Sequence, residues 1–361
     1  MEIPPTVTHD YNAITTMRIA NLAFVILCFR GYFSGFLGDT LAITIILNCV
    51  IACAIDYHHV RQSFFVFAIL SFLTIYNKDV LALIDILAFI YILRGTKLKK
   101  LIQLNAIILS LFLLTWFVLF KVGILHDSLK VMPKGTAHCM GFDNSNQFGM
   151  QGFYIIASLF LLVRGKGRIF VFLIIPIINE TFFKLAVSRT PWLGGYVIML
   201  VMLFSWVGAL RPQMRYIIGI LPGLILGLVI YIAKHLVQYP ELDVIFSTRF
   251  SNAANLLNNL TPLNLIIGFP QQKSIIIDSS YLMILCSGGI MALVLFFGKF
   301  YQAIVYRWKI VLPYMPFLIA MLALGIGENA FSSVGALSVI FWYIIFESND
   351  KYELKKLTNH A

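Results

Sequence analysis

Two arginines in this sequence stand where they could bind an anionic group. Arg189 lies in "LAVSRTPWLGG", at the end of an apolar segment, and Arg249 lies in the polar stretch "DVIFSTRFSNAANLL". The planar guanidinium group forms paired hydrogen bonds with phosphate oxygens. Either arginine alone could be a snorkelling or solvated cation, which is a common role near a membrane boundary. Together with Lys184 and Lys234, they predict a site for the head group of a phosphorylated lipid.

Carboxylates near the ends of apolar segments are the candidate proton acceptors. Asp278 directly precedes "SSYLMILCSGGI", and Glu328 stands in "GIGENAF". A partly desolvated carboxylate can act as a general base for a sugar hydroxyl, although Asp278 could equally cap a helix. Asp85 and Glu180 lie inside apolar segments, where charge is costly and often functional. We expect a buried structural role for Asp85, or a proton relay in a transporter, and an ion pair of Glu180 with Lys184.

Uncharged polar residues gather in "GFDNSNQFG", over residues 141–149. The side chains of Asn144, Asn146 and Gln147 could hold sugar hydroxyls, but the same residue types favour ordinary turns, and both interpretations stay open. His126 and His138 have no obvious partners for a metal site, and the chain lacks a D-x-D motif. We therefore expect no metal and no other cofactor.

Membrane-spanning helices must position these residues. The 361 residues are 60% hydrophobic and 12% charged, with a mean hydropathy of +0.88, whereas a soluble domain carries about twice that charge. We expect a single all-α membrane-embedded domain over 1–361, with no nucleic-acid partner. A spanning helix needs roughly 20 mostly apolar residues. About twelve segments qualify, at about 17–35, 38–56, 62–77, 80–95, 101–125, 147–164, 168–187, 191–210, 214–235, 279–305, 309–327 and 331–347.

The basic residues predict the orientation of these segments. Short connections such as "RGTKLKK", "RGKGR", "RPQMR" and "YRWK" are rich in Lys and Arg, as is the tail "KYELKK". With about twelve spans, all of these clusters fall on one side, which the positive-inside rule makes the cytoplasm. Both termini are then cytoplasmic.

Two long polar connections face outward in this topology, at about 126–146 and 236–278. They are longer than a simple crossing requires, so we expect them to form the active-site face. The second includes an expected amphipathic helix on the membrane interface, with apolar residues at helical spacing from Phe250 to Leu260 and Pro262 as its end. The following "LNLIIGFP" is apolar enough to dip back into the membrane.

Several motifs, in order, resemble those of the bacterial O-antigen and capsular polysaccharide polymerases, and more broadly of the O-antigen ligase superfamily. They are "GFDNSNQFG", "SRTPWLG", "TRFSNAANLL" with "IIGFP", "DSSYLMILCSGGI" and "GENAF", and the resemblance covers about residues 140–345. It implies a GT-C-like bundle with a large extracytoplasmic loop in the bacterial cytoplasmic membrane. The implied reaction transfers an undecaprenyl-pyrophosphate-linked glycan to a sugar hydroxyl without metal or nucleotide.

The resemblance also implies roles for individual residues. Arg189 and Arg249 would hold the donor pyrophosphate, with Lys184 and Lys234 assisting. Asp278 stands where the ligases have a histidine, and Cys286-Ser287-Gly288 stands where they have an acidic residue before the glycine. Both departures favour a polymerase, with Asp278 as the base. The residues expected to contact glycan are His138, Asn144, Asn146, Tyr281 and Glu328.

We therefore expect a polymerase that joins lipid-linked repeat units at the outer face of the membrane. Donor and acceptor are both undecaprenyl-pyrophosphate-linked glycans, and a flippase and a chain-length regulator are the expected protein partners. An O-antigen ligase is the alternative in the same class. A lipid-linked oligosaccharide flippase or a membrane scaffold is the alternative in another class.

Overall fold

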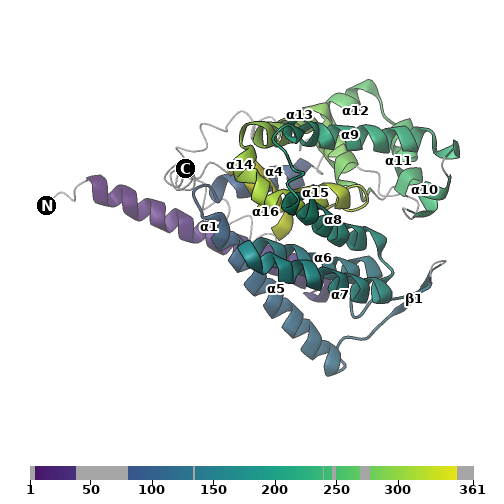
Figure 1. Ribbon diagram of the computed structural model, residues 1–361, viewed down its shortest axis with the longest axis horizontal. Coiled ribbons are helices and arrows are strands. Elements are labelled where there is room, and N and C mark those ends of the chain that lie inside the picture. The colour runs from purple at the N-terminus through teal and green to yellow at the C-terminus, as the bar shows by residue number, and fades with distance from the viewer. Residues whose placement is uncertain are drawn as a thin grey trace.

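The computed structural model describes residues 5–37, 80–132, 135–238, 240–245, 249–268 and 277–347. Within these ranges the chain is mostly helical, with one small hairpin of β1 (Leu129–Met132) and β2 (Gly135–His138) (Figure 1). The longer helices are α1 (Pro5–Leu37), α4 (Val80–Ile92), α5 (Leu98–Lys121), α6 (Ser145–Leu162), α7 (Arg168–Ala186), α8 (Arg189–Trp206), α9 (Met214–Lys234), α11 (Arg249–Asn258), α13 (Ser280–Tyr306), α15 (Met315–Leu324) and α16 (Ala336–Glu347). The short helices are α10 (Pro240–Ile245), α12 (Pro262–Ile267) and α14 (Trp308–Val311).

Four helices in the described ranges are long and apolar enough to cross a membrane: Leu98–Lys121, Gly165–Ala186, Met214–Lys234 and Ser280–Tyr306. Much of their apolar surface is not covered by protein, as Phe170 and Ile177 of α7 show, with exposed fractions of 70% and 68%. Such surface would be unfavourable in water and is matched by lipid. The chain thus has the architecture of a helical membrane protein.

Several apolar segments of the sequence match helices of the structure. The segment expected at 168–187 is α7, that at 214–235 is α9, and that at 279–305 is α13. The segment expected at 309–327 is divided between α14 and α15, which a short turn at Leu312–Tyr314 separates. The segments expected at 38–56 and 62–77 lie outside the described residues.

A buried polar network joins three helices in the interior. The hydroxyl of Tyr32 in α1 donates to Oδ1 of Asn105 in α5, at 2.6 Å, and Nδ2 of Asn105 donates to Ser158 of α6, at 3.0 Å. All three residues are buried. Hydrogen bonds of this kind satisfy polar groups that would otherwise be costly among apolar side chains.

Helix α13 is broken in its middle, and α12 packs against the break. Gly288 and Gly289 have non-helical backbone angles, with φ of Gly289 at +61°. A Cβ atom on Gly289 would lie 2.1 Å from the carbonyl oxygen of Ile266 in α12, so only glycine permits this approach. Pro262 does not end the preceding helix as expected. It begins α12 at the N1 position, and Thr261 is the N-cap.

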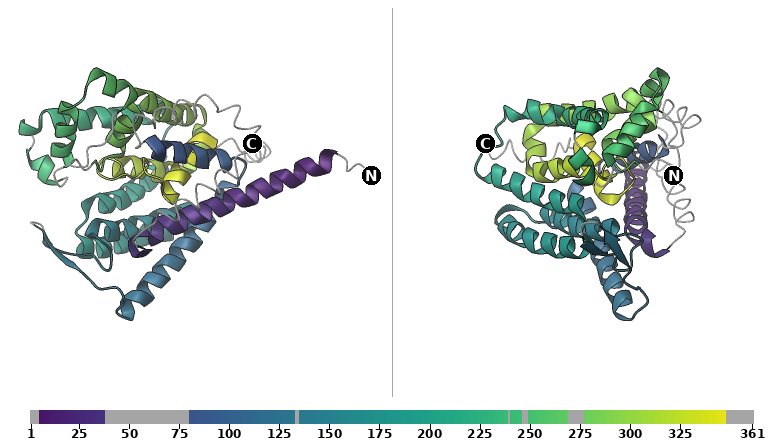
Figure 2. Two further views of the ribbon diagram at one scale, coloured as in Figure 1. Left: turned by 180° about the vertical axis from the view of Figure 1, so that it is seen from behind. Right: turned by 90° about the vertical axis from the view of Figure 1, so that its right-hand side faces the viewer.

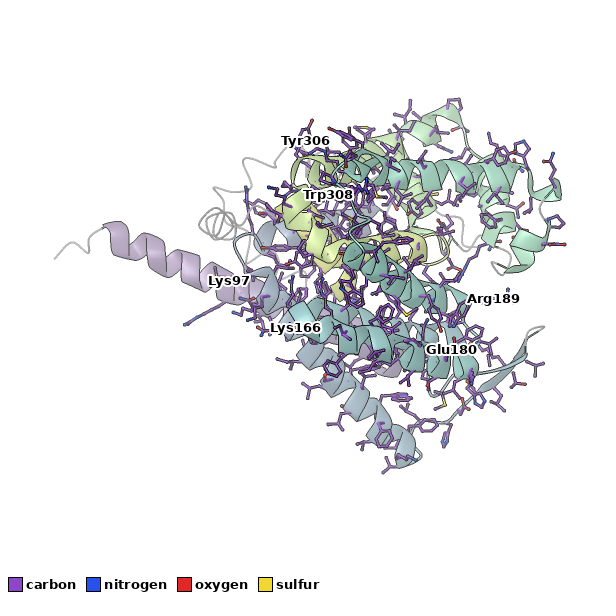
Figure 3. The ribbon with its side chains drawn as sticks, in the orientation of Figure 1. Lys97, Lys166, Glu180, Arg189, Tyr306 and Trp308 are labelled. Atoms are coloured by element: carbon purple, nitrogen blue, oxygen red, sulfur yellow. The ribbon has the colours of Figure 1, made fainter. Side chains whose placement is uncertain are left out.

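The connections gather at two opposite ends of the molecule. Lys97 and Lys166 lie toward one end, which we call the basic end, and Arg189 lies toward the other, which we call the loop end (Figure 3). At the basic end, Arg168 donates to the carbonyl oxygen of Pro313 at 2.8 Å and Arg307 to that of Phe346 at 3.4 Å. The hairpin and the helices α10 and α11 lie at the loop end, as further views confirm (Figure 2).

Candidate functional site

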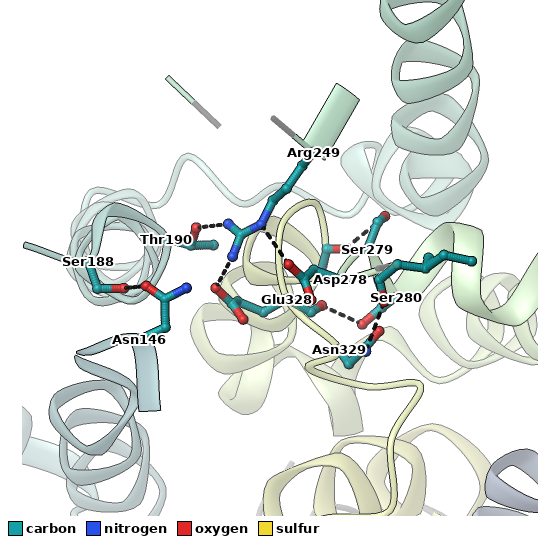
Figure 4. A network of polar contacts seen from close by, with 11 residues as sticks. Asn146, Ser188, Thr190, Arg249, Asp278, Ser279, Ser280, Glu328 and Asn329 are labelled. Carbon is teal, nitrogen blue, oxygen red and sulfur yellow. Dashed lines mark hydrogen bonds and ion pairs between the residues drawn. The ribbon is translucent and has the colours of Figure 1, made fainter. Parts of the chain in front are cut away.

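Arg249 is the centre of a polar cluster at the loop end. Its Nε donates to Asp278 Oδ2 at 3.3 Å, and its Nη2 donates to Glu328 Oε1 at 2.6 Å. Its Nη1 donates to the hydroxyl of Thr190 at 2.9 Å (Figure 4). The four residues come from α11, the segment just before α13, the loop after α15 and the first turn of α8. Residues far apart in sequence therefore form one site.

The site is largely buried and opens beside Asp278. The exposed fraction of the side chain is 12% for Arg249, 16% for Glu328 and 37% for Asp278. A small pocket lies beside Arg249 and Asp278. These two residues contribute polar groups to a wall that is otherwise mostly apolar. The pocket is lined by Val229, Arg249, Phe250, Ala253, Ile277, Asp278, Ser279, Leu282 and Ile326.

Arg249 is the first residue of α11, and the packing of the apolar face of α11 holds this helix in place. Phe250, Ala253 and Leu256 of α11 are buried, and the helix packs on α9. The amphipathic helix expected in this loop is therefore present, but protein covers its apolar face. This packing fixes the first residue of α11, Arg249, over the pocket.

Hydrogen bonds between the loop after α15 and the start of α13 hold the two carboxylates in place. The hydroxyl of Ser280 donates to the carbonyl oxygen of Glu328 at 2.8 Å. Nδ2 of Asn329 donates to the carbonyl oxygen of Ile277 at 3.1 Å, and the amide of Ser280 donates to that of Gly325 at 2.9 Å. Asp278 and Glu328 are thus positioned by backbone contacts on either side of them. The N-cap of α13 is Ser279, so Asp278 does not serve as the cap.

Burial is the main influence on the pKa of Glu328, a residue in the loop between α15 and α16. Desolvation raises the pKa of its carboxyl group to about 7, and the nearby charge of Asp278 acts in the same direction. Arg249 acts in the opposite direction, both through its charge and through its hydrogen bond. Glu328 can therefore take up or release a proton near neutral pH.

Thr190 and Gly327 are site residues that the sequence reasoning missed. Thr190 is buried and accepts from Arg249, directly after Arg189 in the chain. A Cβ atom on Gly327 would lie 2.7 Å from Nη1 of Arg249. A side chain at this position would therefore require the guanidinium group to shift. Both residues stand in the motifs "SRTPWLG" and "GENAF", and only the fold reveals what they contact.

Arg189 lies beside this cluster as the half-buried first residue of α8. Its neighbours on both sides are tied to other elements. Ser188 donates to Oδ1 of Asn146 at 2.9 Å, and Thr190 accepts from Arg249. The backbone at Arg189 is therefore fixed between α6 and α11.

Other predicted residues have varied surroundings. Oδ1 of Asn144 accepts from the amide of Gln147 at 2.9 Å and caps α6, which is the turn-forming role left open above. Tyr281 is fully buried, and its hydroxyl donates to the carbonyl oxygen of Leu322 at 2.8 Å. Lys184 and Lys234 are exposed at the ends of α7 and α9.

Two histidines belong to the connection between α5 and α6. His138, at the end of β2, is hydrogen-bonded through Nδ1 to Asp127, whose other oxygen accepts from the amide of Met140 at 2.8 Å. His126 is exposed. In the part of the chain that the structure describes, no group of three or more His, Cys, Asp or Glu residues could hold a metal ion.

Glu180 forms a second polar cluster, with aromatic partners. Its Oε1 accepts from Nε1 of Trp192 at 2.9 Å and from the hydroxyl of Tyr196 at 2.8 Å. These bonds join α7 to α8, and Lys184 lies within electrostatic range of Glu180. Asp85, in α4, is half-buried and within electrostatic range of Arg30 in α1.

Comparisons with protein-family models, with curated protein sequences and with solved structures find no match to this chain. Its chemistry must therefore be inferred from the site itself. A guanidinium group in a mostly buried site can bind an anion strongly, because little water competes for it. A neighbouring carboxylate with access to the pocket can accept a proton.

Proposed function

We propose that the chain is a polysaccharide polymerase that uses undecaprenyl-pyrophosphate-linked repeat units in a bacterial cytoplasmic membrane. The observation that carries the proposal is the position of Arg249, beside a pocket and two carboxylates at one end of a bundle of apolar helices. A lipid-linked substrate places its pyrophosphate at the membrane surface, where such a site can reach it. The proposal includes about twelve spans, cytoplasmic termini and an outward-facing loop end.

Arg249 and Arg189 bind the donor pyrophosphate in this proposal. The bond between the anomeric carbon and the pyrophosphate oxygen breaks, and undecaprenyl pyrophosphate leaves with the bonding electrons. Fixed guanidinium groups stabilise the negative charge that develops on the leaving group. Lys184 and Lys234, exposed at the same end, assist by attracting the anionic donor.

Asp278 accepts the proton of the acceptor hydroxyl, whose oxygen forms the new bond to the anomeric carbon. It is the more exposed of the two carboxylates, so an acceptor hydroxyl can approach it more readily than Glu328. Asn146 and His138, from the neighbouring outer connection, contact the glycan. Because both reactants are anchored in the membrane, the entropic cost of their meeting is reduced.

The test uses cells that lack the chain and are complemented with variants. Arg189→Ala and Arg249→Ala should each shorten or abolish the polysaccharide ladder while membrane abundance stays normal. Normal ladders from both variants would remove the arginines from the mechanism. Cells without the chain should accumulate single repeat units. Accumulation of long lipid-linked polymer would instead identify a ligase, which delivers finished polymer to another acceptor.

A further inference from the structure

The positive charge of Arg249 is already balanced by carboxylates in this structure. Its three nitrogen atoms all donate, and two of the three acceptors are carboxylates. One guanidinium group therefore faces two carboxyl groups, and an incoming phosphate would bring further negative charge into a largely buried site. Such an excess of buried negative charge is strongly unfavourable unless a group is neutralised.

The two carboxyl groups differ in how well their charged forms are stabilised when Arg249 pairs with another anion. Asp278 is 37% exposed and 3.3 Å from Nε, so water can solvate its charge. Glu328 is 16% exposed and 2.6 Å from Nη2. A carboxylate that is buried and loses its cation is the one that takes up a proton.

We propose that Glu328 is the counter-ion that an anionic ligand replaces at Arg249, and that Glu328 takes up a proton as the ligand binds. This inference rests on the proposed function, since it takes the ligand to be a pyrophosphate diester. The ligand then accepts from Nη2 of Arg249 in place of Glu328. Glu328, as a neutral carboxyl group, no longer needs the cation beside it.

The groups around Glu328 agree with this exchange. Arg249 of α11 and Asp278 before α13 face it directly, and Tyr154 of α6 lies within electrostatic range. Burial and Asp278 both favour the protonated form, and Arg249 is the one group among these that favours the charged form. When a ligand engages Arg249, that opposing influence weakens and the pKa of Glu328 rises further above about 7.

The affinity for the ligand depends on pH because ligand binding is coupled to the protonation of Glu328. Below the pKa of Glu328 the carboxyl group already holds its proton, and ligand binding releases or takes up none there. Above that pKa each bound ligand requires one proton, so the affinity falls by up to about tenfold for each pH unit. Ligand binding should thus weaken as the pH rises from about 6.5 to 8.5.

The test is calorimetric titration of the full-length chain in lipid nanodiscs with P1,P2-dimethyl pyrophosphate. This probe carries two negative charges throughout the range, so its own titration does not contribute. Titrations at pH 8 in buffers of different ionisation enthalpy give the number of protons taken up. We expect about one proton per ligand for the wild-type chain and none for Glu328→Gln, which should bind about tenfold more tightly at pH 8.

Glu347→Gln is the matched control, because Glu347 pairs with Arg94 at 3.5 Å, at the basic end. It should bind and take up protons like the wild-type chain. Wild-type binding that involves no proton uptake and is equally tight at pH 6.5 and pH 8 would overturn the exchange and leave the anion site standing. Failure of both the wild-type chain and Glu328→Gln to bind at either pH would overturn the proposed function, and the exchange with it.

Discussion

The arginines at the two ends of the molecule have different kinds of partner. At the basic end, Arg168 and Arg307 donate to backbone carbonyl oxygens, and Arg164 donates to the hydroxyl of Tyr314 at 2.8 Å. Arg168 also lies over the ring of Phe160, with its guanidinium carbon 4.5 Å from the ring centroid. These neutral partners are parts of the fold and carry no charge that an anionic ligand could replace.

Arg249, at the loop end, is held by side chains instead. Its partners are the carboxylates of Asp278 and Glu328 and the hydroxyl of Thr190, and a pocket lies beside it. An anionic ligand can take the place of a carboxylate. The difference fits a structural role for these arginines at the basic end and the proposed anion-binding role for Arg249. Arg94, which pairs with Glu347, is an exposed exception at the basic end.

The largest expected effect is that of Arg249→Gln. Glutamine can still donate one hydrogen bond but lacks the charge that, in the proposed mechanism, stabilises the leaving pyrophosphate. We expect polymerisation to fall by about 100-fold or more, with normal abundance in the membrane. The measurement is the rate of glycan lengthening per mole of protein. A variant with near-normal rates would contradict a functional role for Arg249 that the arginines at the basic end lack.

Gly327→Ala should displace the guanidinium group without removing it. The added Cβ atom would meet Nη1 of Arg249 at 2.7 Å, so the arginine must shift. We expect activity to fall between about tenfold and 100-fold, because small displacements of a positioning group are costly. Gly298→Ala in α13 is the control, since no atom lies within 4 Å of its added Cβ. Equal activity of the two variants would mean that the position of Arg249 does not matter.

Arg307→Gln should lower stability and leave the chemistry intact. Arg307 donates to the carbonyl oxygens of Ile345 and Phe346 at the end of α16, and glutamine cannot keep both bonds. We expect a loss of about 1–2 kcal/mol in the free energy of unfolding, and activity per folded molecule within about twofold of wild type. Thermal unfolding in nanodiscs measures the first quantity. A stable but inactive variant would contradict a structural role.

Trp192→Phe should have the smallest effect. It removes one hydrogen bond to Glu180 and keeps most of the ring packing, while Tyr196 still donates to the same oxygen. We expect a loss of stability of about 1 kcal/mol or less and normal polymer length. Short polymer from a fully stable variant would place the Glu180 cluster in the functional site as well.

Hydrophobic runs in the sequence were sufficient to predict several of the long helices, because each run must be buried or face lipid over its length. Helix α7, for example, begins at Arg168 as expected and ends at Ala186. The partners of Arg249 could not be predicted in this way. Asp278 and Glu328 lie 29 and 79 residues further along the chain. The packing of α11 and α13 on α9, with the hydrogen bonds from Ser280 to the loop after α15, brings them together.

The functions of single polar residues were harder still to predict. Asn144 occurs in a stretch that suits either sugar binding or a turn, and only the backbone geometry shows that it caps α6. Gly327 carries no side chain to suggest a role, and its importance follows from its distance to Arg249. Such roles depend on contacts between elements, which the sequence of one element does not contain.

The most direct test of the proposed role of Arg249 is reconstitution of the purified full-length chain in liposomes. A lipid-pyrophosphate-linked repeat unit is the sole substrate, and free lipid pyrophosphate and glycan length are measured together. The wild-type chain and Arg307→Gln should lengthen the glycan and release lipid pyrophosphate without added nucleotide sugar or metal, whereas Arg249→Gln should do neither. Turnover by Arg249→Gln at the wild-type rate, or no turnover by the wild-type chain, would contradict the account.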